Sequence, residues 1–130
     1  NARRKLIPVF GKPDGKTISF KRSDSNMIAA PANLEGRRGV YAVIPNSKRL
    51  GGFIPENAYV LADSKTRANP GDLAIFIDAD FNALKSEQNA SANIAIVRKD
   101  SKGKIYGQMV SPDEKISAQT MHKVIMIITE

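Results

Sequence analysis

A chain of 130 residues corresponds to about one domain. With 42% hydrophobic and 25% charged residues it is neither disordered nor collagen-like, and no apolar run approaches the roughly 20 residues of a membrane span. The absence of cysteine excludes disulfides and a cysteine nucleophile, and a lone histidine, His122, argues against a histidine-based metal site. We therefore expect a soluble cytoplasmic domain without metal or cofactor. Because the chain opens on Asn1 without a signal peptide, we expect it to be part of a longer protein.

The net charge of +7 is concentrated near the start of the sequence. Residues 1–22 carry seven basic side chains against one acidic side chain, Asp14, whereas the remainder is almost neutral. Such an arm attracts phosphates, but a domain that reads nucleic acid usually spreads its charge over a face with interleaved aromatic side chains. We interpret residues 1–12 as a basic linker and residues 13–130 as a single β-rich domain. A stand-alone nucleic-acid-binding domain is an alternative that rests on this arm alone.

Short apolar bursts separated by turn residues predict strands along most of the chain. In chain order the predicted strands are Leu6–Phe10, Thr17–Phe20, Val40–Ile44, Ala58–Ala62, Leu73–Ile77, Ala92–Arg98, Ile105–Val110 and Val124–Ile128. Turns rich in Gly and Pro lie between several of them, as at residues 12–15 and 69–72. In the sixth burst both faces are largely apolar, so that strand should be central in its sheet. The pattern predicts a mostly β domain.

Three segments fall outside the strand pattern. Helical turns are predicted at Ala32–Gly36 and, slightly longer, near Ser117–His122. The polar segment Asp80–Ser91 follows a strand and is predicted to be a protruding loop. We expect His122 to be partly exposed before the last strand. The tyrosines are expected to pack within strands: Tyr41, Tyr59 and Tyr106.

Five short segments occur in an order that resembles a known family. They are Ile7–Gly15 (IPVFGKPDG), Ala30–Gly36 (APANLEG), Gly39–Ala42 (GVYA), Gly52–Val60 (GFIPENAYV) and Asn69–Asp72 (NPGD). Together they resemble the C-terminal domains of phage repressors of the LexA and lambda-repressor class, over nearly the whole chain. The resemblance implies twisted antiparallel sheets with one or two short helical turns, assembled as a dimer or tetramer. It also implies an N-terminal helix-turn-helix domain, absent from this chain, that binds operator DNA.

Active members of that family cut their own linker with a serine and a lysine, and the lysine must be neutral to accept the hydroxyl proton. The family serine lies in a Gly-Asp-Ser-Met-x-Pro motif, where this chain has Ser47 without the Met or the Pro that follow it in the motif. The resemblance places the family lysine near Ala95. Lys99 comes close to that position only if the alignment is shifted. The scissile Ala-Gly pair is also missing after Gly11. We predict a degenerate peptidase fold that is not an enzyme; the alternative is an active autopeptidase that uses Ser47 and Lys99.

The C-terminal apolar run suggests how the domain assembles. Its five residues are consecutive: Val124, Ile125, Met126, Ile127 and Ile128. They lack the alternation of apolar and polar residues that is typical of a strand with one solvent-exposed face. Both faces must therefore be covered, either because the strand is central in the domain or because a second subunit packs on it. We predict an oligomer interface there, because a two-fold partner would bring two DNA-binding heads onto two half-sites. The predicted function is the oligomerisation and regulatory domain of a phage-type transcriptional repressor, controlled by an antirepressor protein instead of by self-cleavage.

Overall fold

Strands dominate the part of the chain that the computed structural model describes, residues 6–23, 26–45, 58–86, 88–109 and 114–129. The strands are β1 (Leu6–Asp14), β2 (Thr17–Lys21), β3 (Met27–Ala29), β4 (Val40–Val43), β5 (Ala58–Arg67), β6 (Leu73–Ile77), β7 (Asn89–Lys99), β8 (Ile105–Met109), β9 (Glu114–Ile116) and β10 (Thr120–Thr129). Two 3-10 turns, η1 (Ala32–Leu34) and η3 (Phe81–Ala83), are the only helical segments in these residues. Neither is long or apolar enough to cross a membrane. The prediction of a mostly β domain is confirmed, and each of the eight apolar bursts contributes a strand.

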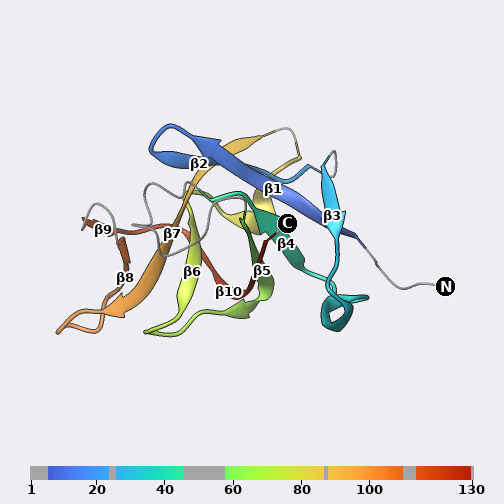
Figure 1. Ribbon diagram of the computed structural model, residues 1–130. Coiled ribbons are helices and arrows are strands. Elements are labelled where there is room, and N and C mark those ends of the chain that lie inside the picture. The colour runs from blue at the N-terminus through green and yellow to red at the C-terminus, as the bar shows by residue number, and fades with distance from the viewer. Residues whose placement is uncertain (1–5, 24–25, 46–57, 87, 110–113, 130) are drawn as a thin grey trace.

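Seven strands close into a barrel (Figure 1). Their order is β2-β1-β4-β5-β10-β6-β7, and β7 pairs back onto β2. β3 pairs with the first residues of β1, Leu6–Pro8, while β8 and β9 continue the sheet beyond β7. β1 and β4 run parallel and the other neighbouring strands antiparallel, so the expectation of antiparallel sheets is wrong at this pair. Parallel neighbours need a connection of about a dozen residues or more, and residues 15–39 provide it.

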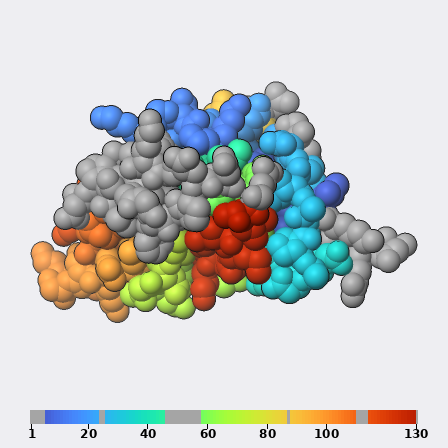
Figure 2. Space-filling model, viewed as in Figure 1, coloured from blue at the N-terminus to red at the C-terminus, as the bar shows by residue number. Residues whose placement is uncertain are grey.

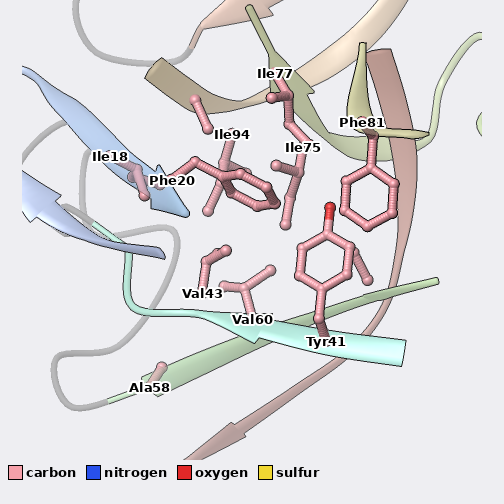
Figure 3. Close-up of a cluster of buried hydrophobic side chains, with 12 residues drawn as sticks. Ile18, Phe20, Tyr41, Val43, Ala58, Val60, Ile75, Ile77, Phe81 and Ile94 are labelled. Carbon is pink, nitrogen blue, oxygen red and sulfur yellow. The ribbon is translucent and has the colours of Figure 1, made fainter. Parts of the chain in front are cut away.

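The barrel interior is filled by side chains from alternate positions of its strands (Figure 3). Four aromatic rings form its centre, and the ring centroids of Phe10, Phe20, Tyr41 and Phe81 lie 5.2 to 6.4 Å apart. Aliphatic side chains complete the cluster: Ile18, Val43, Ala58, Val60, Ala62, Ile75, Ile77, Ala92 and Ile94. Side chains along these strands therefore alternate between the interior and the outer face, because every second residue enters this core.

Two further apolar clusters lie on the outer side of the barrel wall, at the positions that alternate with the interior ones. One is built on β1, β4 and β5, and it is covered in part by Ile28 of β3 and Leu34 of η1. The other is built on β6, β7 and β8 and includes Phe76 and Val97. β7 has apolar residues on both faces and pairs with β2, β6 and β8, which confirms the prediction that Ala92–Arg98 is central.

Of the three segments that fall outside the strand pattern, the structure confirms the prediction for one and corrects it for two. The helical turn predicted at Ala32–Gly36 is confirmed as η1. The one predicted at Ser117–His122 is wrong, because residues 120–123 pair with β6 as part of β10. The segment Asp80–Ser91 is not simply a protruding loop, since Phe81 is buried in the core and residues 89–91 pair with β2. β1 begins at Leu6, so residues 6–12 of the predicted linker lie in a strand, and Val9 and Gly11 pair with β4 in the barrel wall.

Candidate functional site

Of the two residues named for serine and lysine catalysis, the described structure contains only Lys99. Ser47 lies outside the described residues. Lys99 is exposed at the end of β7, opposite Ile105 of β8. Ala95, near which the resemblance would place the family lysine, is buried in the apolar cluster on the outer face of β7. No lysine among the described residues is buried, so none has the apolar surroundings that would keep an amine neutral.

The apolar run on β10 divides between the two faces of the barrel wall. Val124 packs against the interior cluster, whereas Ile125, Met126 and Ile128 pack against the outer cluster and stay partly exposed. Ile127 is 38% exposed. Figure 2 shows the end of β10, in dark red, at the surface beside the cyan segment that contains β3 and η1.

The pairing of β10 is also uneven. β5 pairs with it from His122 to Thr129, whereas its pairing with β6 covers only Thr120–Lys123. The first half of β10 therefore has a neighbouring strand on both edges, whereas among the described residues the run Val124–Ile128 pairs with β5 alone. The second half carries the partly exposed apolar residues, which we call the β10 strip: Ile125, Met126, Ile127 and Ile128.

Sequence reasoning missed a polar pair at one end of the barrel. His122 is 6% exposed, and its Nδ1 atom lies 2.7 Å from the hydroxyl oxygen of Tyr41, which is also buried. The expectation that His122 is partly exposed is therefore wrong, whereas the packed position expected for Tyr41 is confirmed. Burial lowers the pKa of His122 to about 4, against a smaller opposing effect of Asp63, and burial raises the pKa of Tyr41 well above its ordinary value. Both side chains are neutral at pH 7.

The turn η3 closes this end of the barrel over the polar pair. The rings of Phe81 and His122 form a T-shaped contact, with their centroids 4.6 Å apart. The guanidinium carbon of Arg22 lies over the Phe81 ring, 4.1 Å from its centroid. Arg22 also donates a hydrogen bond to the Phe81 carbonyl, at 2.9 Å. The Thr120 hydroxyl accepts from the Phe81 backbone N–H and donates to the carbonyl of Ala79. These contacts hold η3 against β2 and β10.

A buried carboxylate stabilises the neighbouring part of β5. Asp63 is 3% exposed and accepts hydrogen bonds from the Lys65 backbone N–H, the Thr66 hydroxyl and the Arg37 guanidinium, at 2.9, 2.9 and 2.7 Å. Burial opposes ionisation, but these hydrogen bonds and the charge of Arg37 together lower the pKa of Asp63. Asp63 is therefore an ionised, fully bonded group with a structural role, and it is not a free catalytic base.

An open groove of about 430 Å³ lies beside His122 at this end of the barrel. Its walls come from the end of β5, the start of β10 and the η3 turn. The lining residues are largely polar: Ser64, Lys65, Thr66, Arg67, Asp80, Asn82, Gln119, Thr120, Met121 and His122. Most of these residues lie in segments without strong apolar periodicity, so the sequence carried little signal for the groove.

Within the described residues, no cluster of three or more His, Asp or Glu side chains is placed to hold a metal ion. Neither a scan against protein-family models nor a search of curated proteins finds a match for this chain.

Proposed function

We propose that this chain is the self-associating regulatory domain of a phage-type transcriptional repressor and that it does not cleave itself. In this function a second copy of the domain covers the β10 strip, and the pair holds two N-terminal DNA-binding heads on adjacent half-sites of operator DNA. Two features support the proposal: the order of the five repressor-like segments, and the mostly β fold.

The observation that carries the proposal is the exposure of the β10 strip. Three of its residues, Ile125, Met126 and Ile128, pack against an outer apolar cluster and stay partly exposed, and Ile127 is one of only two large hydrophobic side chains among the described residues that are strongly exposed. Tyr59 of β5 pairs with Ile128 and widens the same surface. Aromatic and aliphatic side chains of this kind are typical of the buried centre of a homodimer interface.

The absence of self-cleavage is supported by the position of Lys99. Lys99 is exposed and so lacks the apolar surroundings that this kind of catalysis requires around its lysine. Induction of a repressor without self-cleavage requires another route. An antirepressor protein that competes with the second copy for this domain would supply it, by separating the DNA-binding heads.

The substitution Ile127→Asp tests the proposed interface. Because this side chain is 38% exposed, an Asp can reach water in the monomer, but it would be an unpaired carboxylate in an apolar interface. We expect the variant to keep the circular dichroism spectrum of the wild type and to run as a monomer in light scattering, while the wild type runs as a dimer or tetramer.

Ser101→Asp is a matched control, because it adds the same charge at an exposed turn between β7 and β8. This variant should associate as the wild type does. A wild-type chain that stays monomeric throughout a concentration series would overturn the proposed function.

A further inference from the structure

The His122 ring carries a buried hydrogen-bond donor that no group among the described residues accepts. Tyr41 has no polar partner there besides His122, so its O–H must donate to Nδ1 to be satisfied. A neutral imidazole has one N–H, which then lies on Nε2. No hydrogen bond from Nε2 occurs among the described residues, although the residue is 94% buried and lines the groove. A buried polar group without a partner points to a bound molecule that supplies one.

The charges around this donor favour an anion. Arg67 lies directly opposite His122 on β5, and Lys65 lies two residues before it on the same strand. Neither cation forms an ion pair within the described residues. The one carboxylate that lines the groove, Asp80, accepts a hydrogen bond from the backbone N–H of Asn82.

Two of the three hydroxyl groups that line the groove, those of Thr66 and Thr120, are already engaged, and the third belongs to Ser64. The Thr66 hydroxyl donates to Asp63, and the Thr120 hydroxyl donates to the Ala79 carbonyl. The strong donors left for a ligand are thus the His122 N–H and the two cations. Donors of this kind bind carboxylate oxygens, and charge-assisted hydrogen bonds are about twice as strong as neutral ones.

We propose that this groove binds a small organic carboxylate, with its charged group held by Arg67 and Lys65 and an oxygen accepting the hydrogen bond from Nε2 of His122. The volume of about 430 Å³ falls in the range of sites for small ligands. The site is independent of the β10 strip and of the proposed repressor function, so either can fail without the other.

Succinate is a suitable probe, and the single histidine of the chain makes the test direct. In 15N-resolved NMR at pH 7, the imidazole signals can belong only to His122. We expect succinate to shift the Nε2 signal in a saturable way. Its neutral diamide, succinamide, should bind at least about tenfold more weakly, because it lacks the charge.

Arg67→Gln should weaken succinate binding about tenfold, whereas Arg98→Gln, which removes an exposed arginine from β7, should leave it unchanged. Equal weakening by both variants would show an adventitious ion only and would overturn the proposal, as would imidazole signals that succinate does not move. A blocked peptide, acetyl-Gly-Asp-Gly-amide, presents the same carboxylate from a polypeptide. Tighter binding of that peptide than of succinate would overturn the assignment to a free acid.

Discussion

The hydroxyl oxygen of Tyr41 and the Nδ1 atom of His122 lie 2.7 Å apart inside the barrel, joining β4 to β10 across the intervening strand β5. Both groups are neutral, because burial disfavours the imidazolium and the phenolate alike. The pair is thus a neutral hydrogen bond within an otherwise apolar core. Its strength depends on pH only through His122.

The first prediction is a loss of stability in mild acid. The pKa of His122 is about 4 in the folded chain and about 6.5 when unfolded, so between these values the unfolded chain binds more protons. The contribution of His122 to the free energy of unfolding is fully present above pH 6.5. It falls as the pH decreases towards 4, by at most about 3 kcal/mol. Urea denaturation at pH 7 and at pH 4.5 measures the difference.

The variant His122→Gln separates this effect from the titration of carboxylates, because an amide stays neutral over the same range and can accept the Tyr41 hydrogen bond. We expect the variant to lose less free energy of unfolding than the wild type between the two pH values. NMR titration of the imidazole should show no protonation above about pH 5. Equal losses in the two proteins would contradict the prediction.

The second prediction concerns the Tyr41 hydroxyl. Tyr41→Phe removes the donor and leaves Nδ1 of His122 unpaired in the core, which should reduce the free energy of unfolding by about 1–3 kcal/mol. Tyr106→Phe is the control, since Tyr106 is half-buried on β8 and its hydroxyl forms no hydrogen bond with the described residues. Similar costs for both variants in urea denaturation would show that the hydrogen bond contributes nothing specific.

Local periodicity explains why most strands were predictable. In segments such as Thr17–Phe20 and Leu73–Ile77, the apolar pattern that defines the strand lies within the segment itself. The two missed strands, β3 and β9, have three residues each, too few for a pattern to develop. Barrel closure depends on pairings such as Ile18 with Ala92, which join distant parts of the chain and leave no local signal.

The candidate site was less accessible to sequence reasoning for the same reason. His122 follows the polar segment before the last apolar run, and its burial depends on Phe81 and Tyr41, which come from η3 and β4. Nothing near His122 in the sequence indicates those neighbours. A usable hint was Tyr41 itself, a polar side chain between Val40 and Ala42 in a strand whose residues are all buried.

The third prediction concerns Gly11, where β1 and β4 approach closely. A Cβ atom at this position would lie 2.7 Å from Cγ2 of Ile18 and 2.9 Å from Cγ1 of Val43, closer than side chains tolerate. Gly11→Ala should therefore lower the free energy of unfolding by about 1–3 kcal/mol. Lys12→Ala, at the next and exposed position of the same strand, should change it by less than about 0.5 kcal/mol. Thermal denaturation that ranks the two variants equally would contradict the prediction.

The last prediction concerns self-cleavage. Incubation at alkaline pH deprotonates lysine side chains, and a neutral lysine is what a serine and lysine pair needs in order to react. We expect the chain to stay intact under these conditions, as measured by intact-mass spectrometry over time. The reason is geometric: Lys99 lies at the exposed end of β7, and Ala95, near which the resemblance to the repressors would place the catalytic lysine, has no amine to accept a proton.

Two variants make the outcome interpretable. Ser47→Ala removes the candidate nucleophile, and Lys99→Ala removes the candidate base, so neither should alter the mass spectrum if the chain is inactive. A fragment ending near Gly11 that forms in the wild type and is absent from both variants would establish the autopeptidase alternative. A fragment that persists in both variants would come from a contaminating protease, because hydrolysis by the proposed pair cannot proceed without its nucleophile.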